Sequence, residues 1–442
     1  MRKFWIEIRS SLWFVPGALV LAAIGLALGL VELDERFGDQ LRPWGWLPFL
    51  KAGAEGARSM LTAIASSMIT VAGVAFSITI VTLSLASTQY TPRILRNFMR
   101  DRANQSVLGV FVGIYAYCLI VLRTIRGGYE DGFVPLIAVF AGVLLALVGI
   151  GYLIFFIHHT AASIQASYIL DAITNETLEA IDTLFPQKLG EPDESSPATA
   201  AESTAWHPVS SPATGYIQSV DRDALWRLAD ERDMLVRQEL EAGDFVVEGA
   251  PIISGDRISD DDAAAALRRV FAIGNFRTVD QDAGFGIRQI VDIAMKALSP
   301  GVNDTSTAVS CVDYLSAILS LLAQRRLDSP FRRGEGDQRV IAPVPLFADF
   351  VAKSLDEIRL SAAGNVSVIL RMLRLLTRVA QVTDAAARRL ALLDQARIIS
   401  SLADSSVPVP HDRARINAEL DALRLALSAG EQLPALATTG AA

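Results

Sequence analysis

The sequence predicts a mainly α-helical membrane protein. Four transmembrane helices are expected first, followed by a cytosolic region with a small, barrel-sandwich-like β unit and a helical bundle. Of the 442 residues, 51% are hydrophobic and only 20% are charged, whereas soluble domains carry about 25% charged residues. The mean hydropathy of the whole chain is +0.35. The long apolar runs all lie near the amino terminus, so a membrane part and a water-exposed part are expected.

Four apolar runs predict the membrane part. They are Leu12–Val31, Met60–Ala86, Val107–Leu122 and Phe133–Ile157, and none has a charge in its middle. A bilayer core requires roughly 20 apolar residues in a helix, so three runs are long enough and the third is marginal. The first run is longer than a signal peptide requires and no small-residue cleavage site closes it before Glu32, so it is interpreted as a retained span.

Basic residues at the ends of the spans predict the orientation, because positive charge is retained on the cytosolic side. One side carries seven basic residues and the other six, but the loop after the second span packs four arginines closely together. This density predicts that the amino terminus is cytosolic, and four spans then return the carboxyl terminus to the cytosol. The first side has Arg2, Lys3, Arg9, Arg93, Arg96, Arg100 and Arg102, and the second has Arg36, Arg42, Lys51, Arg58, Arg123 and Arg126.

Changes of composition along the chain predict its domains. A helix is expected to continue from the fourth span until Pro186, where a segment rich in Pro, Ser and acidic residues begins. The predicted organisation is a transmembrane domain at 1–159, a helical stalk continuing span four at 160–185, a linker at 186–205, a small β-rich unit at 206–257, a helical domain at 258–431 and a disordered tail at 432–442.

The β-rich unit resembles the half-motifs of barrel-sandwich hybrid folds, such as biotinyl and lipoyl domains. Gly215, Gly243 and Gly249 stand where turns need a permissive backbone. No lysine lies between Lys188 and Lys296, so the carrier lysine of such domains is absent. A structural or assembly element is therefore expected rather than a swinging arm.

The second span carries a stripe of small and hydroxylated residues at spacings of three, four and seven. Two interpretations remain open. Small residues allow membrane helices to pack closely, and hydroxyl groups can also line a water-filled conduction path. Four spans are few for a path within one chain, so a pore would need several subunits. The stripe consists of Ser66, Thr70, Gly73, Ser77, Ser84 and Thr88.

A polar segment in the helical region supplies the second group of candidates. It begins with Arg277 and Thr278, contains Gln-Asp-x-x-Phe-Gly from Gln281, and continues as Asp-Ile-Ala-x-x-Ala-Leu-Ser-Pro-Gly-x-Asn-Asp from Asp292. With the second span and the Pro-Arg that follows it, this segment resembles the bacterial family of predicted membrane proteins called domain of unknown function 2254. The resemblance covers nearly the whole chain and implies a multi-pass protein of the bacterial inner membrane, but no activity. In that family the Asn-Asp pair is commonly followed by proline, where this chain has Thr305.

Three roles are open for this polar segment. Its residues could form a structural corner or subunit contact, a ligand- or ion-sensing pocket, or a catalytic site. Catalysis is disfavoured because no histidine is near in sequence and no nucleophile with a base is evident. The carboxylates are too irregularly spaced for a convincing divalent-ion site. The candidates are Arg277, Gln281, Asp282, Asp292, Asn303 and Asp304.

Composition also narrows the function. A net charge of −8 argues against a nucleic-acid partner. The two cysteines and four histidines have no metal-ligand spacing, so neither a metal nor another cofactor is expected, and the protein is not expected to be an enzyme. The leading hypothesis is an oligomeric inner-membrane channel for an ion or small solute, with the bilayer and copies of itself as partners. A membrane-anchored scaffold or sensor and a membrane-bound enzyme are the alternatives.

Overall fold

The computed structural model describes residues 13–41, 53–89, 101–126, 133–186, 205–258, 260–327, 339–343 and 345–428. The chain is mainly helical and divides into two compact units, Met1–Tyr168 and Ile169–Ala442. Most of the predicted linker, the predicted tail and most of the arginine-rich loop after the second span lie outside the described residues.

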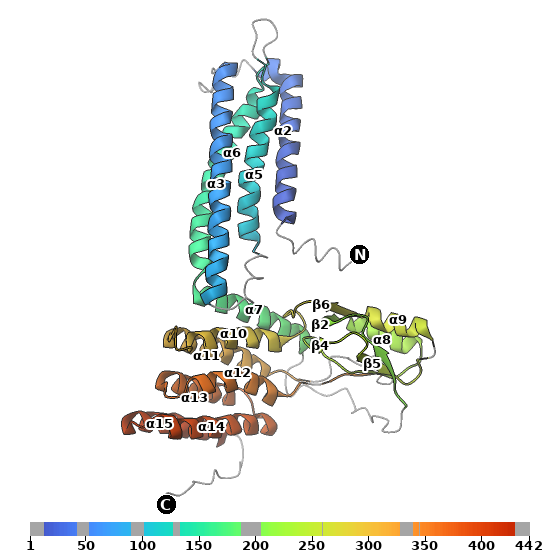
Figure 1. Cartoon of the computed structure of the whole chain (residues 1–442), viewed down its shortest axis with the longest axis vertical. Coiled ribbons are helices and arrows are strands. Elements are labelled where there is room, and N and C mark those ends of the chain that lie inside the picture. Colours follow the sequence, from blue (N-terminus) through green and yellow to red (C-terminus); the bar gives the residue numbers. More distant parts are fainter. Residues whose placement is uncertain are drawn as a thin grey trace, which may run out of the picture. The chain divides into compact units, whose positions relative to one another are not determined.

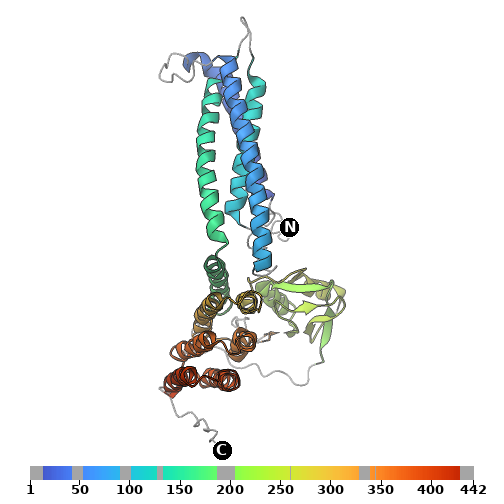
Figure 2. The same ribbon diagram turned by 60° about the vertical axis from the view of Figure 1, so that its left-hand side comes forward.

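The first unit contains long apolar helices that run side by side (Figure 1, Figure 2). Helix α5 contacts the other three described helices of this unit, and its buried side chains include Phe111 and Tyr117. The helices are α2 (Phe14–Leu41), α3 (Ala54–Gln89), α5 (Arg102–Thr124) and α6 (Leu136–Ser163).

Glycines bring these helices close together. A Cβ atom at Gly109 would lie 2.7 Å from Leu19 Cδ1, and one at Gly113 would lie 3.3 Å from the Cβ of Ala23. The two glycines are four residues apart on α5, so α2 packs against one small-residue face, a recurrent arrangement in membrane helices. Gly142 likewise makes room for Leu61, which ties α6 to α3.

Buried polar groups at one end of the same helices find partners. Asp34 is 4% exposed and accepts hydrogen bonds from the backbone N–H groups of Ile137 (3.1 Å) and Ala138 (2.9 Å). It thereby satisfies donors of the first turn of α6, which no carbonyl within the helix can reach. The hydroxyl of Tyr117 donates to the Ala138 carbonyl over 2.7 Å. The start of α6 is therefore fixed to α2 and α5.

The stalk predicted after the fourth span is not one continuous helix. Helix α6 ends at Ser163 and α7 (Ala166–Leu184) begins after a two-residue break. The Ser163 hydroxyl donates to the Thr160 carbonyl, a local bond that competes with the helical pattern. The break differs from the continuous helix that the sequence predicted.

In the second unit, the described strands form two small sheets. One has the order β1-β5-β3-β7 and the other β4-β2-β6. Helices α8 (Arg222–Glu231) and α9 (Asp261–Arg269) pack with them around a shared apolar core that includes Ile217 and Leu225. The strands are β1 (His207–Ser210), β2 (Gly215–Val220), β3 (Val236–Gln238), β4 (Phe245–Val246), β5 (Pro251–Gly255), β6 (Phe271–Gly274) and β7 (Val340–Ile341).

Two of these strands come from outside the segment 206–257 in which the β unit was predicted. Strand β6 follows α9 directly and pairs antiparallel with β2, and β7 pairs parallel with β3. Both strands are very short, and β6 continues an apolar stretch that the sequence suggested was helical. Their pairing depends on contacts between distant segments, which local periodicity cannot reveal.

The remaining helices form a layered stack of pairs (Figure 1, Figure 2). Helices α10, α12 and α14 follow one another down one side, and α11, α13 and α15 down the other. Apolar side chains such as Leu315, Leu355 and Leu373 fill the space between the layers. The helices are α10 (Ala283–Ala297), α11 (Thr305–Leu322), α12 (Phe347–Ser361), α13 (Val366–Ala380), α14 (Ala386–Ser406) and α15 (Pro410–Ser428).

Among the described residues, five helices are long and apolar enough to cross a membrane. They are α2, α3, α5, α6 and α11. The sequence predicted the first four as spans and assigned α11 to the cytosolic bundle. The small sheets are confirmed as a β region, whereas the number of spans and the barrel-sandwich arrangement stay predictions.

Candidate functional site

The hydroxyl stripe lies on the outside of the first unit. Ser66, Thr70, Gly73, Ser77 and Ser84 are all exposed on α3, and the side chain of Thr88 lies outside the described residues. Residues two apart on a helix are rotated by about 200°, so Ser66 and Ser77 lie nearly opposite Met68 and Ala75. Those two are 7% and 3% exposed and belong to the apolar core. The face of α3 that carries the stripe is thus turned away from the chain's own bundle.

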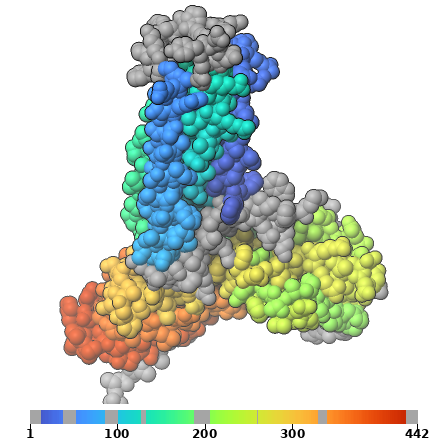
Figure 3. Space-filling view, turned by 45° about the horizontal axis from the view of Figure 1, so that its top comes forward, coloured from blue at the N-terminus to red at the C-terminus, as the bar shows by residue number. Residues whose placement is uncertain are grey.

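Two hydroxyl groups of the stripe donate hydrogen bonds to backbone carbonyls of α3 itself. Thr70 Oγ1 donates to the Ser66 carbonyl over 2.8 Å, and Ser77 Oγ donates to the Gly73 carbonyl over 2.9 Å. Each hydroxyl oxygen keeps lone pairs that can accept from, or coordinate, a group outside the helix. A Cβ atom at Gly73 would meet nothing within 4 Å, so the stripe is open along its middle. Figure 3 shows α3 as an uncovered column of the bundle.

The buried side chains described in the first unit are mostly apolar, such as Leu61, Phe111 and Ile114, and the buried polar ones include Asp34, Thr82 and Gln105. Because the stripe lies on the outside of these helices, the described residues of one chain do not enclose a path along it. Any path along it would need α3 helices from several copies.

The polar candidates of the second unit do not form one pocket. Gln281 and Asp282 precede the first residue of α10, whereas Asn303 and Asp304 follow its last turn. A helix of 15 residues is about 22 Å long at 1.5 Å per residue. The candidates are therefore divided between the two ends of α10, and Asp292 lies between them.

At the amino-terminal end of α10, Arg277 and Asp282 form a partly buried ion pair. Asp282 Oδ2 accepts from Arg277 Nη2 over 2.6 Å, and Asp282 Oδ1 caps the helix by accepting from the Phe285 N–H over 3.0 Å. Gly243, with φ of +99°, passes so close that a Cβ there would lie 2.1 Å from Asp282 Oδ2. Burial raises the pKa of the Asp282 carboxyl, and the Arg277 guanidinium opposes that rise.

Other residues of the motif Gln281–Gly286 join further elements to α10. The Gln281 side chain accepts from the Val220 N–H over 2.8 Å and donates to the Val220 carbonyl over 3.1 Å, so it binds both backbone groups of the last residue of β2. Phe285 lies beneath the Arg277 guanidinium, 5.1 Å from its centre. At Gly286, α10 passes so close to α7 that a Cβ would lie 1.9 Å from Thr177 Oγ1. The motif is a junction of the β region, α7 and α10.

At the other end of α10, Asp304 is the N-cap of α11. It accepts from the Thr307 N–H over 3.0 Å and from the Thr307 hydroxyl over 2.5 Å. Asn303 precedes it with φ of +49°, a conformation that asparagine tolerates better than most residues. These hydrogen bonds lower the pKa of Asp304. Thr305 Oγ1 accepts from the Asn365 side chain over 2.8 Å.

Asp292 takes part in a separate charged group on the side of α10. It accepts from Arg288 one turn earlier over 2.7 Å, and Arg288 also pairs with Glu357 of α12. This arrangement ties two helices of the stack together. It leaves Asp292 away from both ends of α10.

A cavity beside the start of α10 contains charged residues that the sequence analysis did not single out. It has a volume of about 80 Å³, and its lining includes Arg222, Gln238, Glu241, Asp282 and Lys353. Burial lowers the pKa of the Arg222 guanidinium. Burial, and then the nearby Asp244 carboxylate, raise the pKa of Glu241. These lining residues come from four distant stretches of sequence, so no local motif could have identified them.

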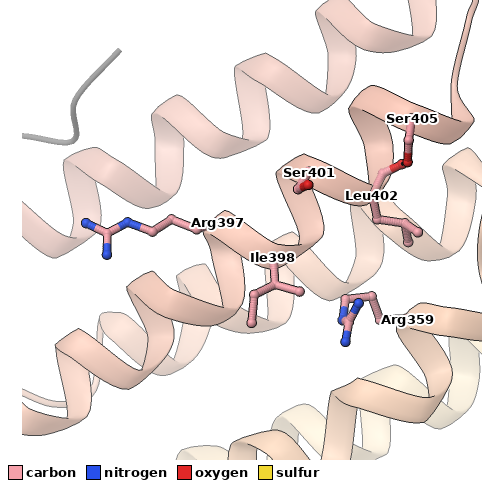
Figure 4. A pocket seen from close by; sticks show the side chains of 6 residues that line it. All are labelled: Arg359, Arg397, Ile398, Ser401, Leu402 and Ser405. Carbon is pink, nitrogen blue, oxygen red and sulfur yellow. The ribbon is translucent and has the colours of Figure 1, made fainter. Parts of the chain in front are cut away.

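A second, wider hollow of about 420 Å³ lies between α12 and α14 and is more open (Figure 4). Its two arginines, Arg359 and Arg397, point in different directions (Figure 4). Arg397 pairs with Asp394 on its own helix over 2.9 Å. Because the cations do not converge, this hollow is a poor candidate for a site. Nor does the described part of the chain contain a group of three or more His, Cys, Asp or Glu residues placed to hold a metal ion.

Comparison with known proteins agrees with the membrane character of the first unit. The family of predicted membrane proteins named domain of unknown function 2254 matches residues 9–378. The chain belongs to this family. It is 33% identical over 426 residues to uncharacterized proteins of Mycobacterium bovis and Mycobacterium tuberculosis, covering 92% of this chain and 79% of each relative. No solved structure matches the chain.

Proposed function

We propose that this member of the domain of unknown function 2254 family is the subunit of a homo-oligomeric channel of the bacterial inner membrane. Helices α2, α3, α5 and α6 would cross the bilayer, with both termini cytoplasmic. Copies would meet through the hydroxyl stripe of α3, which would line the path. The observation that carries this proposal is the position of the stripe on α3. It lies nearly opposite the face that packs against the other helices of the same chain.

The hydroxyl geometry favours a cation as the permeant species. The hydroxyl protons of Thr70 and Ser77 take part in hydrogen bonds to carbonyls of α3. Their oxygen atoms therefore present lone pairs to the outside of the helix. Oxygen lone pairs can replace part of the hydration shell of a cation. No acid or base is needed along the stripe for this role.

The same hydrogen bonds favour a second candidate, a scaffold or sensor without a path. A hydroxyl that bonds back to its own helix is compatible with lipid or with close helix packing. Ser66, Gly73 and Ser77 would then allow α3 helices to approach closely, and the assembly would serve the second unit. The two candidates share the interface and differ in whether water enters it.

Cysteine substitution tests both the interface and the path. Ser77→Cys should cross-link copies of the protein in the membrane, because the stripe would face a partner. Ser67→Cys is the matched control: Ser67 is also exposed and also donates to its own helix, over 2.8 Å to Ala63, but it lies about 80° from Ser77 around α3. The native Cys118 and Cys311 are buried, so the background reaction should be low.

Flux through proteoliposomes tests conduction. Ser77→Leu should abolish cation flux while the oligomer still assembles, and Ser67→Leu should leave flux intact. Cross-linking without flux in the wild-type protein would overturn the channel and support the scaffold. Absence of cross-linking at Ser77→Cys, in protein that is monomeric in nanodiscs, would overturn both.

A further inference from the structure

The charged cavity at the start of α10 is unusual because several of its charges lack a close counter-ion. Among the described residues, no acidic oxygen lies within 4 Å of the Arg222 guanidinium or the Lys353 ammonium. Arg222 is nevertheless partly buried, and the acid that acts on it electrostatically, Glu241, makes no ion pair with it, which is unfavourable for a buried charge. The arginine and lysine come from α8 and α12 and line the same cavity.

The first turn of α10 contributes further positive potential. Ala283 and Gly284 line the cavity and begin a helix of 15 residues, whose first N–H groups have no partner within the helix. A Cβ at Gly284 would lie 3.7 Å from Lys353 Nζ, so the ammonium lies close to this turn. Helix N-termini with adjacent cations bind anions readily.

The acidic residues of the cavity do not cancel this potential. The charge of Asp282 is offset by Arg277 at 2.6 Å, and its other oxygen is occupied by the Phe285 N–H. The remaining charged residues of the lining are Arg222 and Lys353, which are positive, and Glu241, which is negative. Their net charge is about +1. Leu184, Phe185 and Phe350 give the cavity an apolar side.

We propose that this cavity binds a small anion carrying a carboxylate or phosphate group, held by Arg222, Lys353 and the first turn of α10. A volume of about 80 Å³ accommodates a group of several heavy atoms, since about 10–15 Å³ already holds a water molecule. Glu241 stands beside the anion and limits its affinity. The site does not depend on conduction through the first unit, and it lies where α7, the β region and α10 meet.

Calorimetric titration of the full-length protein, in nanodiscs of neutral lipid, with inorganic phosphate tests this site. Saturable binding is expected. Arg222→Gln and Lys353→Gln should each weaken it about tenfold or more, because each removes a charged hydrogen-bond donor. Glu241→Gln should tighten it, an effect that a purely structural role would not produce. Lys353 is exposed, so Lys353→Gln should fold normally even if Arg222→Gln does not.

Matched controls come from the same kinds of element. Arg227 is exposed on the same helix as Arg222, and Lys296 is exposed near the end of α10. Arg227→Gln and Lys296→Gln should bind phosphate as the wild type does. Binding of an anionic phospholipid in place of free phosphate, lost in Lys353→Gln, would identify a lipid headgroup as the source of the same chemistry. Failure to bind either, or equal loss in Arg227→Gln and Lys296→Gln, would overturn the proposal.

Discussion

At the scale of single residues, Asp304 shows how one side chain starts an element. Its carboxylate accepts from the N–H and the hydroxyl of Thr307, so it satisfies a donor that α11 leaves open. Asp304→Ala should lower the free energy of unfolding by about 1 kcal/mol. Asp304→Asn should lose less, since asparagine is also a good N-cap. Thermal unfolding of the purified protein measures both.

The pH dependence of the free energy of unfolding is a second test of the role of Asp304. Hydrogen bonds lower the pKa of Asp304 from its ordinary value of 3.8. An acid whose pKa is lower in the folded state contributes stability that is fully present above the ordinary value and is lost as the pH falls through the lowered pKa. The stability difference between the wild type and Asp304→Asn should therefore shrink below about pH 4. A difference that stays constant down to pH 2 would contradict the assignment of Asp304 as the charged cap.

The contrast between Asp304 and the cavity residues shows which features of a site can be predicted from the sequence. A cap is a local feature, because the N–H group that it binds lies three residues away in the sequence. Arg222, Glu241 and Lys353 meet only after three separate segments have folded together. Gly243 was recognised as a turn residue, but not as the position that leaves room for the Asp282 carboxylate.

At the scale of elements, the crossing of α7 and α10 depends on the absence of a side chain at Gly286. A Cβ there would lie 1.9 Å from Thr177 Oγ1 and 2.9 Å from Thr177 Cβ, so one helix would have to move. Gly286→Ala should destabilise the protein by about 1–3 kcal/mol, the usual cost of overpacking. Differential scanning fluorimetry measures the change.

Two further variants distinguish the crossing from a general effect of alanine. Gly301→Ala introduces a Cβ that meets nothing within 4 Å, so it should have little effect. Gly286→Ala combined with Thr177→Ala should recover part of the loss, because the nearest atom is removed. A double variant as unstable as the sum of both single variants would argue against this contact as the cause.

Elements were predictable where their signal was long and periodic. The four apolar helices of the first unit and the helices of the stack follow from apolar spacing. The short strand β6 was missed because Phe271–Gly274 offers only four residues and pairs with β2, more than fifty positions earlier. The break between α6 and α7 was missed because no proline or glycine marks it in the sequence.

At the scale of the whole molecule, the number of spans decides whether the two ends of the second unit lie on the same side of the membrane. Helix α11 is apolar enough to cross a bilayer, yet it packs against α10 and α13 of the helical stack. Asp313, on α11, pairs with Arg371 over 2.6 Å, and Arg388 donates to the carbonyl of Leu322 at its end. Charged side chains are costly in the hydrocarbon core of a bilayer. Their presence on and around α11 therefore favours four spans.

Reporter fusions test this count directly. With four spans, fusions after Pro186 and after Ser428 should report the same compartment, and basic residues at the span ends predict that this is the cytoplasm. If α11 also crossed the bilayer, the two fusions would report opposite compartments, because one additional span lies between them. Fusions within the segment 127–132, between α5 and α6, should report the periplasm in either case and so serve as the control. Periplasmic activity of the fusion after Pro186 would overturn the orientation, and the cavity beside α10 would then face a different pool of anions.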